Sequence, residues 1–294
     1  MVEKSEVQGD FVQLTDSPGA GQHICNRGED LSMGQEVLAA GTRLQPAMVS
    51  LLASVGCVPV PVVARPRIAI LTTGDELIDP ADYPGPGQIR EGNTLHLAAL
   101  ARAAGADVIR SGVVRDDLAG LTDTFRSALE ACDILVTTGG VSMGKYDLVG
   151  EALEAVGVEK VFHKVAIKPG KPVWFGTFGD KLVFGLPGNP VSCWVGHDVF
   201  VNPAIAKLSG LPASEWVQPL RVGRWNGNPT RENNREQHLP AIAVQGADGV
   251  DELDLVRWKS SADLVGLSKA RVLAVVPPNE VVRKGDRVLY RSIV

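Results

Sequence analysis

The chain has 294 residues, of which 45% are hydrophobic and 21% are charged, and its formal net charge is −5. This composition is typical of a globular protein, and the length allows two domains of moderate size. The negative charge disfavours nucleic acid or an anionic membrane as the main partner. No apolar run reaches the roughly 18 residues of a membrane span, and the N-terminus has no apolar signal-peptide core. We therefore expect a cytoplasmic protein with neither a nucleic-acid nor a membrane partner.

The four cysteines are far apart in the chain and form no C-x-x-C pair. Each of them lies among apolar residues, so we expect buried free thiols and a reducing compartment. They are Cys25, Cys57, Cys132 and Cys193.

Residues 1–65 contain incomplete pieces of secondary structure. FVQLT, at 11–15, predicts a strand, and the apolar spacing within 47–55 predicts a short helix. CVPVPVV, at 57–63, is interpreted as an edge segment interrupted by proline. The apolar pattern is too short to build a core, so we expect a partial β-rich segment that packs on something else, such as another subunit.

Residues 66–210 alternate between strand and helix patterns, which predicts a three-layer αβα domain with a mainly parallel sheet. Ligands of such sheets bind beyond the carboxyl ends of the strands. The expected strands are 67–74, 106–114, 133–140, 158–167, 172–178 and 181–188. The expected helices are 93–105, 116–132, 147–157 and 189–210.

Residues 211–294 have short alternating segments separated by turn pairs such as PPNE and KGD. This pattern predicts a small C-terminal all-β domain, either a barrel or a sandwich. Its clearest strands are expected at 271–278 and 286–294.

Two strands of the central domain end in the same way. The first ends in Thr72, Thr73 and Gly74, and the other in TTGG, at 137–140, with Ser142 just beyond. Threonine hydroxyls and glycine amides are suitable partners for phosphate oxygens. The alternative, that each glycine only makes a tight turn, stays open for either loop. Two matching loops at one edge favour a phosphate-bearing ligand.

Carboxylates follow these loops, and they indicate a hard divalent cation. Glu76, Asp116 and Asp147 each lie just after an expected strand. Mg²⁺ takes oxygen ligands, usually one or two carboxylates with phosphate and water. Asp117 has a structural alternative as the cap of the following helix, which Asp116 and Asp147 share in part. The histidines are scattered, so no site for a softer metal is expected.

Basic and rigid segments complete the set. Lys164, Lys168 and Lys171 crowd around a Pro-Gly turn, and lysine is a common phosphate partner. In GLPGNPVS, at 185–192, two prolines stiffen the backbone and Gly188 allows a ligand to approach. Asn189 is expected to cap the next helix. A solvated charge run and a plain rigid turn are the structural alternatives.

These motifs occur in one order: TTGDEL, RDD, TTGGVSMGKYD, KVAIKPGKP and GLPGNPVS. The series resembles the molybdopterin molybdenumtransferase family, that is, the MoeA proteins and the matching domain of gephyrin. The likeness extends to residues 26–44 and, more weakly, to the tail. It implies an enzyme of molybdenum cofactor biosynthesis that inserts molybdate into adenylylated molybdopterin and releases AMP, with Mg²⁺ as cofactor.

The resemblance also implies roles for individual residues. The family has an arginine in the tail, but no residue is assigned to it here, because neither Arg231 nor Arg235 matches it cleanly. The implied catalytic residues are Glu76, Asp116, Asp147, Lys164 and Lys168, the first three also holding the metal. For substrate binding the resemblance implies Pro187, Pro190 and Ser261. The loop chemistry described above indicates the others, namely Thr73, Gly74, Thr138, Gly139, Gly140, Ser142, Gly188 and Asn189.

One departure from the family concerns the N-terminus. Family members carry a long stretch of residues ahead of the point that matches Met1, so we expect either a start assigned too late or a truncated relative. A truncated non-catalytic molybdopterin-binding or scaffold protein is therefore one alternative function. Molybdopterin adenylyltransferase is another, although that family usually lacks GLPGNP and the β tail. A homodimer, and contact with the adenylyltransferase of the same pathway, are implied by the resemblance.

Overall fold

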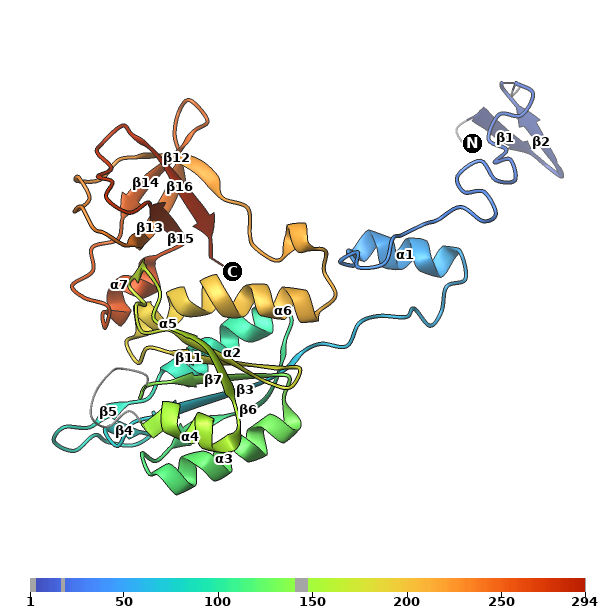
Figure 1. The fold of residues 1–294 in the computed structure, drawn as a ribbon. Helices are drawn as coiled ribbons and strands as arrows, with labels where there is room; N and C mark the ends of the chain where they lie inside the picture. Colours follow the sequence, from blue (N-terminus) through green and yellow to red (C-terminus); the bar gives the residue numbers. More distant parts are fainter. Residues whose placement is uncertain (1–3, 17–18, 141–147, 294) are drawn as a thin grey trace. The chain divides into compact units, whose positions relative to one another are not determined.

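The computed structural model describes residues 4–16, 19–140 and 148–293. The chain divides into two compact units, Met1–Val58 and Pro59–Val294 (Figure 1). Each unit is described by itself below.

The first unit contains a hairpin and one helix. Strands β1 (Ser5–Gln8) and β2 (Phe11–Leu14) pair antiparallel, and α1 spans Pro46–Ser54. The strand predicted at 11–15 and the helix predicted at 47–55 are thus confirmed. The edge segment predicted at 57–63 is wrong, since no residue in that range is in a strand. Pro59 and Pro61 are two apart, so both remove a backbone donor from the same side of the segment.

The second unit begins with a six-stranded sheet in the order β6-β3-β7-β11-β10-β8. Neighbours β6, β3, β7 and β11 pair in parallel, while β10 is antiparallel to both β11 and β8. The mainly parallel sheet is confirmed. The strands are β3 (Arg67–Thr73), β6 (Asp107–Val114), β7 (Ile134–Thr138), β8 (Glu159–His163), β10 (Trp174–Phe178) and β11 (Lys181–Leu186). Two-residue strands β4 (Leu77–Ile78) and β5 (Ile89–Arg90) pair separately.

Helices cover both faces of this sheet because successive strand residues point to opposite sides. Ile68 and Ile70 pack with α2 (Asn93–Ala103) and with the helical run α5 (Pro190–Gly196), a π-helix (His197–Val201) and α6 (Asn202–Leu208). Ala69 and Leu71 pack with α3 (Leu118–Ala131) and α4 (Leu148–Val156). The predicted three layers are confirmed.

One expected strand, 158–167, divides into two that belong to different sheets. β8 ends at His163, and Lys164 has a φ of +76°, which turns the chain out of the sheet. Strand β9 (Ile167–Lys168) then pairs in parallel with β13 of the C-terminal domain. The sequence pattern missed the break because apolar residues continue across it.

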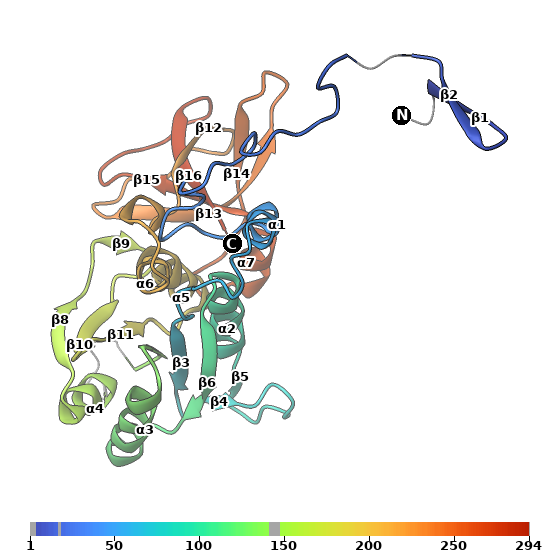
Figure 2. The ribbon, with the colours of Figure 1, turned by 90° about the vertical axis from the view of Figure 1, so that its right-hand side faces the viewer.

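The C-terminal domain is a closed barrel, which decides between the two predicted forms. Its strands follow the order β14-β12-β16-β15-β13, and β13 also pairs with β14 (Figure 2). The elements are β12 (Arg221–Trp225), β13 (Glu236–Gln245), β14 (Asp251–Leu255), β15 (Val272–Val276), β16 (Arg287–Ser292), α7 (Leu264–Lys269) and a 3₁₀ turn (Ala213–Glu215). Buried side chains of α5, α7 and β15 form a core that joins the barrel to the α/β layers.

The π-helix and the barrel also meet through buried polar groups. Arg291 Nη1 lies 3.4 Å from Asp198 Oδ2, and both side chains are buried. His238 Nδ1 lies 3.5 Å from Arg291 Nη2. Because desolvation of a charge is costly unless it is paired, this cluster ties the barrel to the α/β layers.

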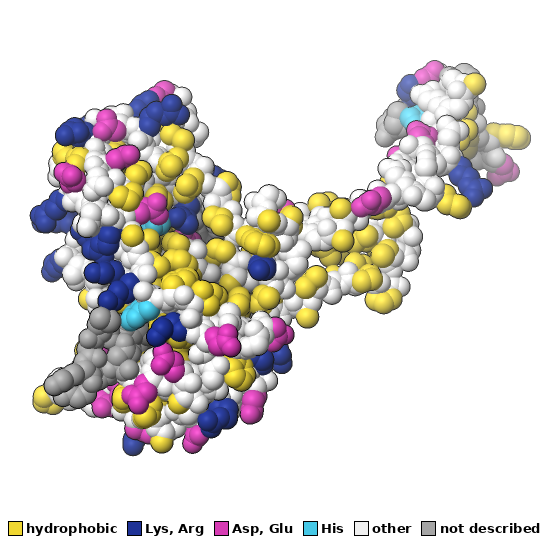
Figure 3. Space-filling view, in the orientation of Figure 1, with side chains coloured by type: hydrophobic (Ala, Val, Ile, Leu, Met, Phe, Trp, Pro, Cys, Tyr) yellow, Lys and Arg dark blue, Asp and Glu magenta, His cyan; other side chains and the backbone are white. Residues whose placement is uncertain are grey.

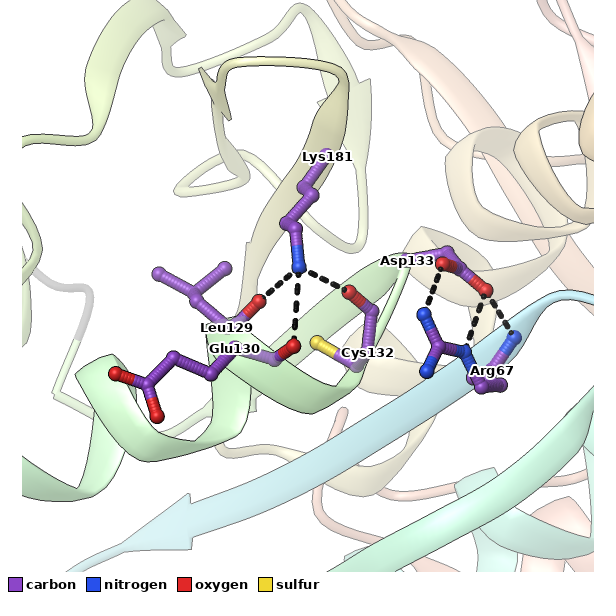
Figure 4. Close-up of polar contacts among 6 residues, drawn as sticks. All are labelled: Arg67, Leu129, Glu130, Cys132, Asp133 and Lys181. Carbon is purple, nitrogen blue, oxygen red and sulfur yellow. Dashed lines mark hydrogen bonds and ion pairs between the residues drawn. The ribbon is translucent and has the colours of Figure 1, made fainter.

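The amino ends of the central strands are fastened by polar contacts (Figure 4). Lys181 Nζ donates to the carbonyls of Leu129, Glu130 and Cys132, which are the free acceptors at the end of α3. Arg67 forms an ion pair with Asp133 at 2.9 Å. These contacts stabilise the edge of the sheet opposite the loops considered below.

The cysteine prediction is only half right. All four thiols are free, but Cys25 is exposed and Cys57 is partly exposed, whereas Cys132 and Cys193 are buried. Cys25 lies in a stretch without helix or strand, so apolar neighbours in the sequence form no core there. Across the described ranges, no helix is long and apolar enough to cross a membrane.

Candidate functional site

Five of the six strands end at one edge of the sheet. Since β8 and β11 are both antiparallel to β10, β8 runs with the four parallel strands. The carboxyl ends of these five strands are Thr73, Val114, Thr138, His163 and Leu186. The predicted site residues of the central domain that lie within the described ranges stand at these ends or shortly after them, so the topology brings them to one edge.

The two Thr-Thr-Gly loops are in direct contact. Gly139 has a φ of +85°, and a Cβ at that position would lie 2.4 Å from the carbonyl oxygen of Thr73. Gly140 has a φ of +58°, and its Cβ would lie 2.6 Å from Val149 Cγ2. Close packing against the end of β3 and against α4 therefore accounts for both glycines without a ligand. Thr73 Oγ1 is buried beside Gly140, and a side-chain hydrogen bond with Thr73 lowers the pKa of the Asp116 carboxyl.

The GLPGN loop rests against the second Thr-Thr-Gly loop. A Cβ at Gly188 would lie 3.5 Å from Gly139 Cα. The Thr138 hydroxyl is buried and donates to the Pro187 carbonyl at 3.1 Å. Four of the predicted substrate-binding residues thus meet at this point.

Asn189 does not cap the following helix as predicted. It makes no side-chain cap hydrogen bond, and its Nδ2 instead donates to Ser261 Oγ at 2.9 Å. The carbonyl of Ser261 also accepts from the Val191 amide at 2.9 Å. Pro190 already occupies the first position of α5, so the helix start is stabilised without a cap. Ser261, which lies on the barrel side, therefore contacts the GLPGN loop.

Carboxylates gather at the β3 and β6 ends. The Asp116 amide donates to Asp75 Oδ1 at 3.5 Å, and a Cβ at Gly74 would touch the Glu76 carboxylate. Burial raises the pKa of the Asp116 carboxyl, and the negative charges of Asp75 and Glu76 add to this rise. A cation between these oxygens would relieve that repulsion.

A complete metal site is not visible in the part of the chain that the structure describes. No group of at least three His, Cys, Asp or Glu side chains there could hold a metal ion. Ser142 and Asp147 lie outside the described residues. The alternative for Asp117 is confirmed, because its Oδ1 caps α3 by accepting from the Gly120 amide at 2.7 Å.

The lysine segment is held by its own backbone and by the barrel. Lys164 N donates to the Val173 carbonyl at 2.8 Å, and Val165 N donates to the Lys171 carbonyl at 2.9 Å. Lys168 pairs with β13, and Arg235 Nη1 donates to the neighbouring Ile167 carbonyl at 3.1 Å. The barrel therefore fixes where Lys168 lies.

Basic side chains are abundant on this side of the molecule. Figure 3 shows Lys and Arg side chains gathered along the left side of the barrel, on the face turned to the viewer. Positive charge at one edge of the unit favours an anionic ligand despite the negative net charge of the chain.

A polar group that the sequence pattern did not predict begins α2. Glu91 is buried and accepts from the Thr94 amide at 2.8 Å, and Thr94 Oγ1 lies 2.7 Å from Thr72 Oγ1. Asn93 Nδ2 donates to the Gly188 carbonyl at 2.7 Å. The available signal was the run Glu-Gly-Asn-Thr ahead of an apolar helix pattern, which was interpreted only as a helix start.

The chain matches two family models. Residues 69–207 match the probable molybdopterin binding domain, and residues 1–56 match the MoeA N-terminal region, described as domains I and II.

Among similar proteins, a molybdopterin molybdenumtransferase of a Nostoc species is 34% identical over 298 residues, covering 100% of this chain and 68% of the relative. Molybdopterin molybdenumtransferase 2 of Mycobacterium tuberculosis is 38% identical over 275 residues, which cover 89% of this chain and 67% of the relative.

Among solved structures, a MoeA protein of molybdopterin biosynthesis from Pyrococcus horikoshii has a TM-score of 0.78 at 26% identity, covering 99% of this chain and 71% of that chain. The chain thus spans about two thirds of the length of these relatives. On these matches, the chain belongs to the MoeA-type molybdopterin molybdenumtransferase family.

Proposed function

We propose that this protein acts in molybdenum cofactor biosynthesis, where it inserts molybdate into adenylylated molybdopterin and releases AMP. The observation that carries the proposal is the meeting of five strand ends at one sheet edge, in a chain of this family. Both Thr-Thr-Gly loops, the GLPGN loop and the lysine segment follow these ends. The edge therefore offers the groups that an anionic, phosphate-bearing substrate requires.

Within this proposal, Lys164 and Lys168 gather the anionic groups, namely molybdate and the phosphates of the substrate. Release of AMP breaks a P–O bond of the pyrophosphate link while an oxygen of water or molybdate bonds to that phosphorus, and negative charge develops on the phosphate that leaves. Ammonium groups held in fixed positions stabilise that charge, and positioning supplies more of the rate than a strong nucleophile would. The positive φ at Lys164 and the pairing of Lys168 with β13 fix the backbone that carries these two side chains.

The carboxylate group fits Mg²⁺ by the chemistry of its oxygens and by the raised pKa of Asp116. Asp116 and Glu76 would hold the ion, together with Asp147. A bound Mg²⁺ would neutralise charge on the pyrophosphate link. The chain's own part is to bring the Asp116 and Glu76 carboxylates near each other, where a bound cation would favour their ionised forms.

Further assignments belong to the same proposal. The substrate site would be lined by the residues predicted to bind the substrate. These are Thr73, Gly74, Thr138, Gly139, Gly140, Ser142, Pro187, Gly188, Asn189, Pro190 and Ser261. Residues 66–210 would bind the molybdopterin and 211–294 would support the lysine segment, after an N-terminal remnant at 1–65. A homodimer in the cytoplasm, in contact with the adenylyltransferase of the pathway, completes the proposal, whose support is the family match.

The test is AMP release from adenylylated molybdopterin, with Mg²⁺ and with or without molybdate. We expect molybdate-dependent release by the unaltered chain and a loss of at least about 100-fold in Asp116→Asn, since a charged group at the reacting phosphate is removed. Asp123→Asn is the matched control, because Asp123 is an exposed α3 residue that forms an ion pair with Arg126. Equal release by both variants would overturn the role of Asp116. ATP-dependent attachment of AMP to molybdopterin would instead identify an adenylyltransferase.

A further inference from the structure

Three consecutive carbonyl groups of the GLPGN loop are each held by a different group. The Gly139 amide donates to the Leu186 carbonyl at 3.3 Å. The Thr138 hydroxyl donates to the Pro187 carbonyl at 3.1 Å. Asn93 Nδ2 donates to the Gly188 carbonyl at 2.7 Å. We call these three contacts the carbonyl clamp.

The clamp decides where the loop's amide groups point. In a planar trans peptide, the carbonyl and the following N–H point in opposite directions. The Pro187 carbonyl points to Thr138, so the Gly188 N–H points away from it. The Gly188 carbonyl points to Asn93, so the Asn189 N–H points away from Asn93. Gly188 and Asn189 are exposed, and neither amide donates to another residue in the described ranges.

Asn93 is the outermost member of the clamp and comes from a different element, the first turn of α2. Its amide nitrogen also lies 3.5 Å from Thr138 Oγ1, which accepts from the Cys193 thiol at 3.6 Å. A backbone carbonyl can only accept, so a hydrogen-bond donor is required at this place, and the Asn93 amide nitrogen supplies it. An aspartate would have the same shape but would put a carboxylate against two oxygens.

We infer that Asn93 is a positioning residue for the reaction. It holds the Gly188 carbonyl, and through that peptide it aims the Asn189 amide, with the Gly188 amide, at an oxyanion of the bound substrate. This inference rests on the proposed function, because the oxyanion is a phosphate or molybdate oxygen of that reaction. Asn93 itself contacts the loop and not the reacting atoms.

The clamp predicts a split between kcat and KM. Asn93→Ala keeps the lysines and carboxylates but lets the loop amides drift. We expect kcat for AMP release to fall by about 10- to 100-fold, with KM changed by less than about threefold, because a small misplacement acts mainly on the transition state. Asn226→Ala is the matched control, since Asn226 Nδ2 donates to exposed Asp254 in the barrel.

The Asn93→Asp variant adds a readout that a purely structural role would not move. The Gly188 carbonyl oxygen and Thr138 Oγ1 face the new carboxyl and raise its pKa. At low pH the carboxyl is therefore protonated, and its O–H can donate to the Gly188 carbonyl. We expect the deficit in kcat relative to the unaltered protein to shrink by at least about fivefold between pH 8 and pH 5.5. A deficit independent of pH would overturn the inference, as would an Asn93→Ala kcat equal to that of Asn226→Ala.

Hydrogen exchange separates this inference from the proposed function. The Val191 and Cys193 amides, which donate to the Ser261 and Asn189 carbonyls, should exchange faster in Asn93→Ala than in Asn226→Ala. This measurement uses the full chain without substrate. If the unaltered protein released no AMP, the proposed function would fail, and unchanged exchange would then remove the clamp as well.

Discussion

The contact between the two Thr-Thr-Gly loops makes Gly139 the most sensitive position of the sheet edge. A Cβ there would lie 2.4 Å from the Thr73 carbonyl oxygen, and a Cβ contact under 3.0 Å is essentially never observed. The loops must therefore move apart by about 0.6 Å, which as overpacking costs about 1–3 kcal/mol. The φ of +85° adds about 1–2 kcal/mol for any residue with a Cβ.

Gly139→Ala should therefore lower the free energy of unfolding by about 2–5 kcal/mol. Gly105→Ala is the matched control, because Gly105 has a φ of +96° and no atom within 4 Å of its Cβ position. That variant has the backbone term alone, about 1–2 kcal/mol. Urea unfolding followed by tryptophan fluorescence measures both. Equal losses in the two variants would refute the loop contact.

Three further predictions concern buried and capping groups. Burial, with the nearby His96, lowers the pKa of His197 to about 3. Below the ordinary histidine pKa of about 6.5, the folded state then binds fewer protons than the unfolded state. The free energy of unfolding therefore falls as the pH is lowered from about 6.5, and the loss reaches about 3 kcal/mol at pH 4.5. In pH-dependent urea titrations His197→Phe should lack this fall, and His23→Phe should keep it. Arg291→Met leaves the Asp198 carboxylate buried without this cation and should lower the free energy of unfolding by about 3–5 kcal/mol. The double variant with Asp198→Asn should recover part of this loss. A loss below about 1 kcal/mol in Arg291→Met would contradict the buried pair. Lys181→Met should cost about 1–2 kcal/mol and speed amide exchange in the last turn of α3, and unchanged exchange would show that the capping contacts contribute nothing.

The layered architecture could be predicted because local patterns and packing agree. The alternation of Ile68, Ala69, Ile70 and Leu71 between two covered faces is what a buried parallel strand requires. The break at Lys164 could not be predicted. It depends on a positive φ and on pairing with β13, some seventy residues away in the chain.

The candidate site could be predicted where charged residues or a Gly-Pro loop directly follow a predicted strand. The places of Glu76, Asp116 and the GLPGN loop just beyond strand ends were predicted in this way, and their roles stay predictions. Asn93 was missed because its function in the structure is a long-range contact with Gly188, and a residue at a helix start looks the same whether or not such a contact exists. The expected cap at Asn189 failed for the same reason, since Ser261 in the barrel competes for its side chain.

The most direct test of the proposed function is a molybdate titration of AMP release by the intact 294-residue chain, with adenylylated molybdopterin and Mg²⁺. The account predicts release that rises with molybdate and saturates, above controls without protein and without molybdate. Release that does not depend on molybdate would contradict it. So would a folded chain that binds the adenylylated ligand and releases no AMP, which is the behaviour of a binding protein.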